Sequence, residues 1–310
     1  MSEILFLEPV FKDVIWGGNT LRTRFGYAIP SETTGECWAV SGHKNGDCKI
    51  RGGRYDGCTL GQLWQEHREL FGSQAGDQFP LLVKIIDARD DLSIQVHPDD
   101  VYAGAHENGS LGKTECWYIL DCGPGATIIV GHNASSPEEL KKMIEEDRWT
   151  ELLRERPIHK GDFFQIEPGT VHAIKGGTLI LETQQSSDVT YRLYDYGRLQ
   201  NGKPRQLHLS QSMDVIVCPA KEAATERSVE ETEAYRLEKL VACQYYAVEH
   251  LVLHGSMRRP AQPLYEIVDV LDGSGTINKT EIRKGDHFLL PHGYGEYELC
   301  GELELMLSRP

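Results

Sequence analysis

The sequence is divided into many short apolar or alternating segments, separated by Gly, Pro, Asn and Asp. Typical examples are FPLLVKIID (79–87), ECWYILDC (115–122), DFFQIEP (162–168) and TLILETQQ (178–185). Regular runs of this length with turn residues between them are typical of β-sandwiches and β-barrels. The sequence therefore predicts an all-β fold.

Two stretches depart from this pattern and predict helices. Residues 60–72 carry apolar side chains at a helical spacing that ends at Gly72. Residues 135–156 begin with Ser136 as the expected N-cap and have Pro137 in the first turn. We expect the second stretch to form a helical insertion between two strands.

A weak internal repeat divides the chain into two parts. The segment 117–128 resembles 266–277, and a second matching pair of Gly-Asp and Pro-Gly positions follows each copy. The polar, acidic stretch 221–234 between the copies reads as a linker. We therefore expect two related β-barrels, a larger one with helical insertions at 1–222 and a degenerate one at 223–310.

The overall charge and the cysteines limit the possible function classes. A formal net charge of −15 disfavours nucleic acids and anionic membranes as partners. The apolar runs are far shorter than the roughly 20 residues of a membrane span, and the N-terminus does not resemble a signal peptide. The eight cysteines contain no C-x-x-C pair, so we expect reduced cytoplasmic thiols instead of a zinc ribbon. A small molecule is the expected partner, while the oligomeric state, monomer or dimer, stays open.

Four polar residues in the first half form a candidate metal site. In the segment SIQVHPD, strand alternation places Gln95 and His97 on one face. Glu115 begins the next strand, and the turn at Pro168-Gly169 delivers His172 to a third. Two imidazoles, a carboxylate and an amide oxygen suit Zn, Mn, Fe, Co or Ni. The second copy of the repeat has lost the Glu and the His, so we expect metal only in the first barrel.

The order Q-x-H, K-x-E and G-D-x5-P-G-x-x-H resembles the metal motifs of the cupin barrel. Gln95 stands in the place of the usual first His, and Pro168-Gly169 replaces P-x-G. Together with five further motifs, these departures resemble the short bacterial form of the type I mannose-6-phosphate isomerase (phosphomannose isomerase) family. The motifs are WAVSGH (38–43), LVKIIDA (82–88), LSIQVHPD (92–99), GKTECWY (112–118) and SDVTYR (187–192). The resemblance extends over about residues 8–215.

This resemblance implies two jelly-roll cupin barrels and a metal-dependent aldose–ketose isomerase. Such an enzyme would interconvert mannose 6-phosphate and fructose 6-phosphate through a cis-enediol. The resemblance also implies one Zn²⁺ per chain, held by the four candidate ligands, although other divalent metals would fit. Further residues implied to line the pocket or lie alongside it are Lys113, Asp188, Arg192, Lys84 and Ser93.

The chemistry of the reaction suggests roles for individual side chains. Lys113 stands two residues before Glu115, on the same strand face, and we favour it with Asp188 for proton transfer. Glu182 and a metal-bound water are the other candidates for the proton, and Glu182 in any case belongs to the expected substrate pocket. Cations suited to phosphate or enediolate oxygens are Arg192, Arg198 and Lys84, and Trp38 is a candidate floor for the sugar.

Two other functions are compatible with a cupin barrel. An Fe(II) oxygenase normally has the full His pair, so Gln95 weighs against it. A non-catalytic sugar-binding cupin would be favoured if Lys113, Asp188 and Arg192 were remote from the metal ligands.

Overall fold

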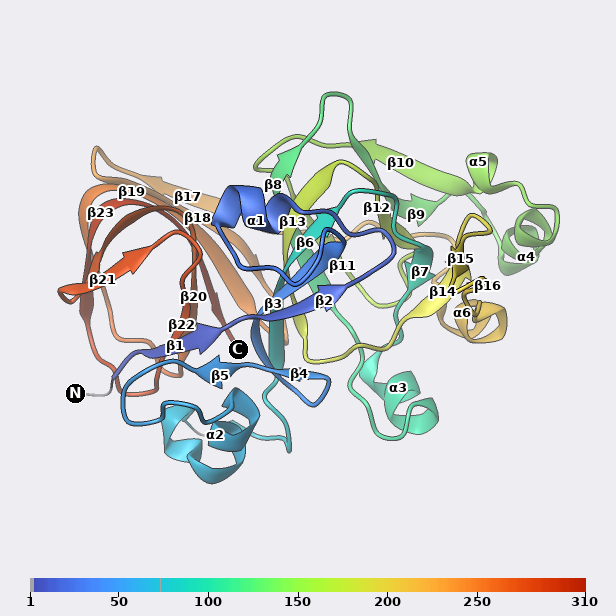
Figure 1. The fold of residues 1–310 in the computed structure, drawn as a ribbon. Helices are drawn as coiled ribbons and strands as arrows, with labels where there is room; N and C mark the ends of the chain where they lie inside the picture. The colour runs from blue at the N-terminus through green and yellow to red at the C-terminus, as the bar shows by residue number, and fades with distance from the viewer. Residues whose placement is uncertain (1–2, 73) are drawn as a thin grey trace.

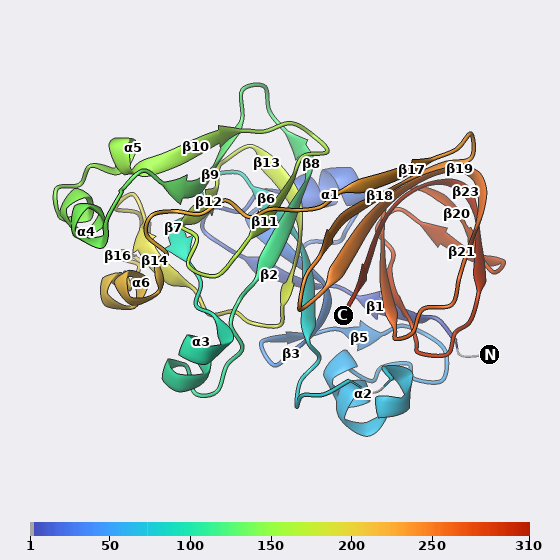
Figure 2. The same ribbon diagram turned by 180° about the vertical axis from the view of Figure 1, so that it is seen from behind.

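The computed structural model describes residues 3–72 and 74–310. Strands dominate it and form three main sheets that lie side by side (Figure 1). The all-β prediction is confirmed. A seven-stranded sheet occupies the middle of the molecule, a five-stranded sheet lies on one side of it, and a curved nine-stranded sheet lies on the other (Figure 2).

The seven-stranded sheet has the order β11-β8-β13-β6-β3-β2, with β4 paired to β3. Every residue of β6 and β13 is buried, as expected of strands that are covered on both faces. The strands of this sheet are β2 (Val10–Asp13), β3 (Thr34–His43), β4 (Gly46–Asp47), β6 (Leu81–Ala88), β8 (Glu115–Cys122), β11 (Phe163–Ile166) and β13 (Thr178–Gln185).

The five-stranded sheet has the order β10-β9-β12-β7-β14 and packs against one face of the central sheet. A shared apolar cluster that includes Ile119, Ile180 and Ile174 fills part of the space between these two sheets. The strands are β7 (Ile94–Val96), β9 (Thr127–His132), β10 (Leu153–Pro157), β12 (His172–Ile174) and β14 (Tyr191–Tyr194).

The nine-stranded sheet covers the other face of the central sheet through a cluster that includes Ile85, Tyr246 and Ile267. Its own concave side holds a second core of leucines and aromatic residues. The predicted domain boundary at residue 222 does not account for β1. This strand comes from the N-terminal end of the chain and pairs with β22 of the C-terminal sheet. The strands are β1 (Leu5–Glu8), β5 (Lys49–Ile50), β17 (Ser228–Glu231), β18 (Tyr235–Ala242), β19 (Ala247–Arg259), β20 (Glu266–Ile277), β21 (Thr280–Arg283), β22 (His287–Leu290) and β23 (Tyr297–Arg309).

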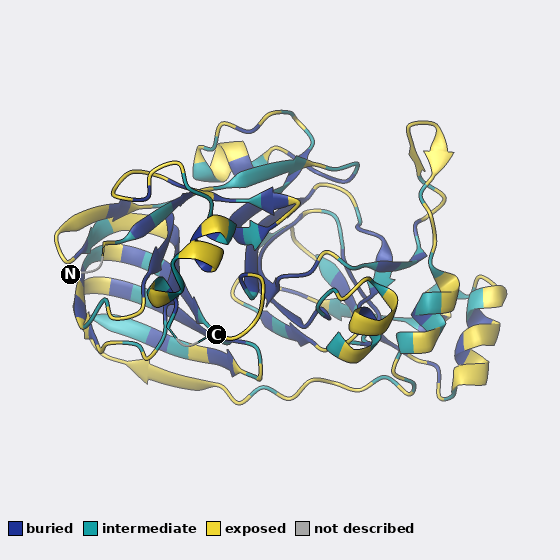
Figure 3. Cartoon of the chain, turned by 90° about the horizontal axis from the view of Figure 1, so that it is seen from below, coloured by how far each residue is buried: buried dark blue, intermediate teal, exposed yellow. Residues whose placement is uncertain are grey.

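Short helices lie at the periphery, with exposed outer surfaces around the buried strands (Figure 3). They are α1 (Thr20–Phe25), α2 (Leu60–Glu66), α3 (Asp100–His106), α4 (Pro137–Glu145), α5 (Trp149–Leu152), α6 (Leu209–Val215) and the 3₁₀ turn η1 (Arg68–Leu70). A separate small hairpin is formed by β15 (Leu199–Gln200) and β16 (Lys203–Pro204). In the described part of the chain, no helix is long and apolar enough to cross a membrane.

The two predicted helical stretches are largely confirmed. The first forms α2 and η1, and the second forms α4 and α5. Ser136 caps α4 as predicted, because its side chain accepts a hydrogen bond from the amide of Glu139. The prediction of helix at 153–156 is wrong: these residues form β10 and pair with the edge of β9. Sheet pairing there outweighs the helical propensity of the Leu, Arg and Glu residues.

Candidate metal centre

Two rows of side chains face each other across the gap between the central and five-stranded sheets. The first row runs across the central sheet in register, with Trp38 opposite Lys84, Lys84 opposite Glu182, and Glu182 opposite Trp117. Directly opposed residues of neighbouring strands share a face of the sheet. Strand alternation from Trp117 adds Glu115 to the same face. The row therefore places three charged side chains, Lys84, Glu115 and Glu182, beside two tryptophans on one buried face of the sheet.

The second row belongs to the five-stranded sheet. His172 on β12 lies opposite Gln95 on β7, and Gln95 lies opposite Arg192 on β14. His97 comes directly after Val96, the last residue of β7, on the same side as Gln95. Three short strands thus bring together residues that are up to 97 positions apart in the sequence. Neither sheet could form the site alone.

The two rows meet in a buried cluster of His97, Glu115 and His172, whose nearest ligand atoms all lie within 4.8 Å of one another. The Nε2 atoms of the two histidines are 3.2 Å apart. The Glu115 carboxylate approaches His172 Nε2 at 3.4 Å and His97 Nε2 at 3.5 Å. Gln95 reaches the same point, since its amide nitrogen lies 3.3 Å from His172 Nε2. The structure therefore brings all four predicted ligands together.

Backbone carbonyls fix the orientation of both imidazoles. Nδ1 of His97 donates to the carbonyl of Val189 at 2.8 Å, and Nδ1 of His172 donates to that of Thr170 at 2.8 Å. With the proton on Nδ1, each Nε2 keeps its lone pair for a metal. Burial lowers the pKa of both side chains, that of His172 to about 4. Both are thus neutral at physiological pH, as metal ligation requires.

The cluster has the properties of a divalent metal site. Glu115 Oε1 is buried without a hydrogen-bond partner, although buried carboxylate oxygens are normally satisfied. Two imidazole nitrogens and this oxygen converge on one spot, and the Lys113 ammonium, which contacts His97 Nε2 and the other oxygen of Glu115, does not satisfy Oε1. Neutral nitrogen ligands with one carboxylate suit zinc in an open, catalytic type of site. The residues therefore fit a single zinc ion.

Two buried lysines balance two buried glutamates beside the cluster. Lys113 forms an ion pair with Glu115, donates to His97 Nε2 at 3.1 Å and lies 3.9 Å from Glu182. Lys84 lies 3.2 Å from Glu182 on the other side. Burial raises the pKa of Glu182, but Lys113 and Lys84 outweigh it and hold that pKa below the usual range. The four charges sum to zero, so a divalent metal would leave this pocket with a net charge of about +2.

Arg192 contributes a further cation without a carboxylate partner. Its Nη1 donates to the carbonyl of Gln206 at 2.9 Å, and its Nε is buried without a partner. Among the described residues, no Asp or Glu forms an ion pair with it. Burial lowers the pKa of this guanidinium, and a half-buried cation of this kind is stabilised by an anion. Its register opposite Gln95 places Arg192 on the same face of the five-stranded sheet as the candidate ligands.

Other predicted pocket residues lie near these rows. Trp38 is buried with the Lys84 ammonium 5.3 Å from its ring centre. Ser93 is buried and lies one strand alternation before Gln95, on the same face. Asp188 is partly exposed, accepts from Asn45 Nδ2 at 2.6 Å and lies 3.7 Å from His43. It lines a cavity of about 260 Å³ together with His43 and Lys44.

Arg198 lies outside the cluster's network of contacts. It forms an ion pair with Asp195 and donates to the carbonyl of Asp91. Its guanidinium also lies over the ring of Tyr196 at 5.0 Å. Among the described residues, none of its hydrogen bonds reaches a candidate ligand. A role at the substrate would require this side chain to exchange partners.

Two residues of the site were missed by the sequence analysis. Trp117 donates to Glu182 at 3.2 Å, and its ring meets His172 edge to face with centroids 5.4 Å apart. Strand alternation from Glu115 was a signal that could have found it. His43 packs against Trp38 beside Asp188, with ring centroids 5.8 Å apart. No spacing in the sequence indicates the contact between His43 and Asp188, which lie 3.7 Å apart in space and about 145 positions apart along the chain.

Comparison with known proteins gives a consistent result. Residues 4–120 match the family model described as phosphomannose isomerase type I, catalytic domain. Residues 236–310 match the model described as mannose-6-phosphate isomerase, cupin domain. The mannose-6-phosphate isomerase ManA of Bacillus subtilis is 50% identical over 312 residues, which cover 99% of both chains.

Solved structures agree with these matches. The crystal structure of a mannose 6-phosphate isomerase from Bacillus subtilis superposes with a TM-score of 0.97 at 46% identity, and the alignment covers 100% of both chains. A zinc-bound mannose 6-phosphate isomerase shares the fold with a TM-score of 0.80 at 15% identity, with 99% of both chains covered.

Proposed function

This chain belongs to the type I mannose-6-phosphate isomerase family, and we propose that it interconverts mannose 6-phosphate and fructose 6-phosphate at the His97–Glu115–His172 cluster. The observation that carries this proposal is the convergence of two imidazole Nε2 atoms and the unsatisfied Glu115 Oε1 on one buried spot, with Arg192, which has no carboxylate partner among the described residues, on the same sheet face as His172. Relatives of about half identity over the full length favour the isomerase over a cupin oxygenase or a non-catalytic sugar-binding cupin.

The four candidate ligands Gln95, His97, Glu115 and His172 would hold one zinc ion. Zinc in such a site polarises the substrate carbonyl and stabilises the negative charge of the enediolate. The carbonyls of Val189 and Thr170 keep both imidazoles oriented for this task. Amide oxygen and nitrogen occupy nearly equivalent positions, so a turn of the Gln95 amide offers its oxygen as the fourth ligand.

The charge balance of the pocket suits a phosphorylated sugar. A phosphate monoester carries about −1.5 to −2 charges at pH 7. The lysine–glutamate quartet is neutral, and the site gains positive charge from the metal and from Arg192. Guanidinium groups can bind phosphate or enediolate oxygens through two parallel hydrogen bonds. The acidic chain thus concentrates its positive charge where the substrate binds.

The isomerisation moves a proton between C2 and C1 of the open-chain sugar. A base removes the proton from C2, the C1 carbonyl oxygen gains one, and the resulting cis-enediol is reprotonated at C1 while its C2 hydroxyl becomes the carbonyl. We assign this transfer to Lys113 and Asp188, which lie beside the cluster and at the cavity with His43, respectively. Glu182, 3.9 Å from the Lys113 ammonium, helps to keep it charged and in place beside Glu115.

The remaining predicted residues are proposed to form the walls of the pocket. Trp38 supplies an apolar surface for the sugar, and Lys84 and Ser93 lie beside it as donors. Arg198 is proposed to contact the phosphate after release from Asp195. We further propose that residues 1–222 carry the catalysis, that the degenerate cupin unit 223–310 supports it, and that the enzyme acts in the cytoplasm.

The test is a coupled assay of mannose 6-phosphate conversion to fructose 6-phosphate with zinc-replete protein. We expect turnover that a chelator abolishes and that added zinc restores. Oxygen consumption is measured in parallel, with no uptake expected. Metal-replete, folded protein without isomerase turnover would refute the proposal.

A further inference from the structure

A second cavity lies on the face of the five-stranded sheet opposite the metal cluster. It has a volume of about 740 Å³, within the range of small-molecule sites. Ile94 and Ile129 form its floor, and Ile94 alternates with Gln95 along β7. The cavity is thus separated from the metal ligands by the thickness of one sheet. None of the candidate ligands lines it.

Three aromatic rings form one wall of this cavity. Trp149 of α5 stacks on Tyr194 of β14, with ring centroids 4.5 Å apart and an interplanar angle of 16°. Tyr196 meets Tyr194 edge to face at 5.0 Å. The rings therefore make a continuous aromatic shelf, with no gap between Trp149 and Tyr194 for a ligand to enter. Tyr196 remains 38% exposed, and the guanidinium of Arg198 lies 5.0 Å from its ring centre.

Local contacts hold this shelf in place. The indole nitrogen of Trp149 donates to Asp147 at 3.1 Å. Both Asp147 and Tyr196 have a positive φ, 53° and 56°. This conformation is disfavoured for residues other than glycine, most of all for a bulky aromatic one, and such strain is concentrated at functional sites. The fold therefore holds Tyr196 in an exposed position despite its unfavourable backbone conformation.

The rim of the cavity is rich in hydrogen-bond acceptors. Among the described lining residues, three carboxylates, Asp91, Asp147 and Glu155, stand against one cation, Lys175, which pairs with Glu155 at 3.0 Å. A second cation, Arg198, lies at the edge of the cavity over the ring of Tyr196. The lining therefore has a formal charge of −2. This charge repels a sugar phosphate, whereas ionised carboxylates are strong acceptors for neutral hydroxyl groups.

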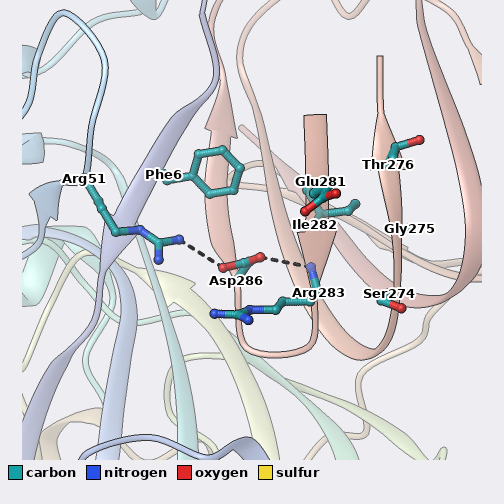
Figure 4. A pocket seen from close by; sticks show the side chains of 9 residues that line it. All are labelled: Phe6, Arg51, Ser274, Gly275, Thr276, Glu281, Ile282, Arg283 and Asp286. Atoms are coloured by element: carbon teal, nitrogen blue, oxygen red, sulfur yellow. Dashed lines mark hydrogen bonds and ion pairs between the residues drawn. The ribbon is translucent and has the colours of Figure 1, made fainter. Parts of the chain in front are cut away.

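A cavity of similar size on the nine-stranded sheet provides a contrast (Figure 4). There the single aromatic ring, Phe6, has the guanidinium of Arg51 5.5 Å from its centre. Arg51 in turn forms a 3.0 Å ion pair with Asp286, as the dashed line shows. A guanidinium thus covers Phe6 much as Arg198 covers Tyr196 at 5.0 Å. What this cavity lacks, among its described lining residues, is a stacked aromatic pair such as Trp149 and Tyr194, so its size alone does not indicate a ligand.

We propose that the cavity at Trp149, Tyr194 and Tyr196 binds a neutral saccharide. The C–H face of a hexose packs on aromatic rings, and its hydroxyl groups donate to carboxylates at the rim; both partners are present here. A quaternary ammonium ion would need rings that surround it, and the stacked shelf does not provide them. The cavity lies behind the strand that carries Gln95 and contains none of the candidate metal ligands; Arg198, proposed above to contact the phosphate, touches its lining at Tyr196 and Asp91.

Binding is measured by ligand-observed NMR with cellobiose and mannobiose as neutral disaccharide probes. We expect dissociation constants on the order of 1 mM, together with a change in tryptophan fluorescence. Tyr196→Ala and Glu155→Gln should each weaken binding about 10-fold or more. Tyr235→Ala, a tyrosine change on the nine-stranded sheet, should leave binding unchanged, as should His172→Ala at the metal cluster. Circular dichroism verifies that each variant is folded.

Three results would overturn the proposal. One is the absence of disaccharide binding up to about 10 mM. The second is binding that survives both Tyr196→Ala and Glu155→Gln or disappears in His172→Ala, since the probe would then occupy another site. The third is preferential binding of tetramethylammonium or of mannose 6-phosphate to the wild-type cavity, recognised by its sensitivity to Tyr196→Ala.

Discussion

Two buried polar clusters, one in each half of the molecule, differ in how their carboxylates are satisfied. At the metal cluster, Glu115 pairs with Lys113 through one oxygen, while the other is buried without a partner. In the nine-stranded sheet, Glu249 and Glu266 surround Arg259, and each of their four carboxylate oxygens accepts a hydrogen bond.

The carboxylates of the second cluster are all satisfied by groups of the chain itself, although Arg259 Nε and Arg309 Nη1 are buried without a partner among the described residues. Arg259 donates to Glu249 at 2.7 Å and to Glu266 at 3.1 Å. Tyr297 donates to the other oxygen of Glu266 at 2.5 Å, and Arg309 to that of Glu249 at 3.2 Å. Breaking such a buried network is costly because it leaves an uncompensated charge. Its role is therefore structural.

The comparison shows how to separate a site from a structural network when both are buried and charged. Burial and shifted pKa values occur in both clusters. The distinguishing property is an excess of acceptors that point at one spot, as the two Nε2 atoms and Glu115 Oε1 do. A closed network requires no ligand, whereas the open one is completed by a cation. The variants below test this distinction, from the largest expected effect to the smallest.

The largest effect is expected for His172→Ala in the open cluster. Loss of one ligand should remove the zinc and lower isomerase activity together, by on the order of 100-fold or more. Metal content by mass spectrometry and the coupled assay check this. His254→Ala, which changes an exposed histidine, is the control and should preserve both. Full zinc content in His172→Ala would contradict the assignment of the ligand.

Arg192→Ala tests whether the cation beside the cluster serves the substrate. We expect kcat/KM to fall by about 100- to 1,000-fold, because an anionic transition state loses a preorganised donor. Zinc content should stay at one per chain, since Arg192 itself is not among the candidate ligands. Arg258→Ala, at a well-exposed arginine, should have no effect. Loss of metal in Arg192→Ala would show that the residue supports the site's structure instead.

Arg259→Met, in the closed cluster, should lower the stability of the protein without changing its zinc content or its activity. The change leaves Glu249 and Glu266 buried with fewer donors, so the free energy of unfolding should fall by about 3–5 kcal/mol. Zinc content and kcat per folded molecule should not change. Urea unfolding and the coupled assay at low temperature measure the two quantities. Unaltered stability, or a lost metal ion, would remove the contrast between the clusters.

Much of the first barrel could be predicted from the sequence because its information is local. Strand alternation places Gln95 with His97 and Lys113 with Glu115, and a turn precedes His172. Family resemblance then supplied the order of the motifs. The fold class and the enzyme family are confirmed by the comparisons, whereas the roles of Lys113 and Asp188 stay predictions.

What the sequence could not reveal depends on pairing between distant strands. The register that aligns Lys84 with Glu182 and Glu182 with Trp117 is set by the sheet as a whole. The helix expected at 153–156 failed for the same reason, because pairing with β9 is not encoded locally. The pairing of β1 with β22 is likewise a contact between distant segments, and for this reason the predicted boundary at residue 222 did not include β1 in the C-terminal sheet.

The smallest expected effect is a change in how stability depends on pH in the closed cluster. Burial raises the pKa of Glu249, but the hydrogen bonds from Arg259 and Arg309 outweigh it and hold that pKa below its usual range. The unfolded chain therefore binds this proton first as pH falls. The stability that Glu249 contributes is present above the unfolded pKa of about 4.3 and is lost as pH falls through the folded value.

Glu249→Gln should thus flatten the acid limb of the stability curve. The variant is expected to be less stable than the wild type at pH 7, and the difference should shrink below about pH 4.5 by up to about 1.4 kcal/mol per pH unit. Urea midpoints across this range measure the slope. Glu302→Gln, at an exposed carboxylate, should run parallel to the wild type. If Glu249→Gln also ran parallel, its carboxylate would not be held in the ionised form by the two arginines, and the closed cluster would lose its electrostatic explanation.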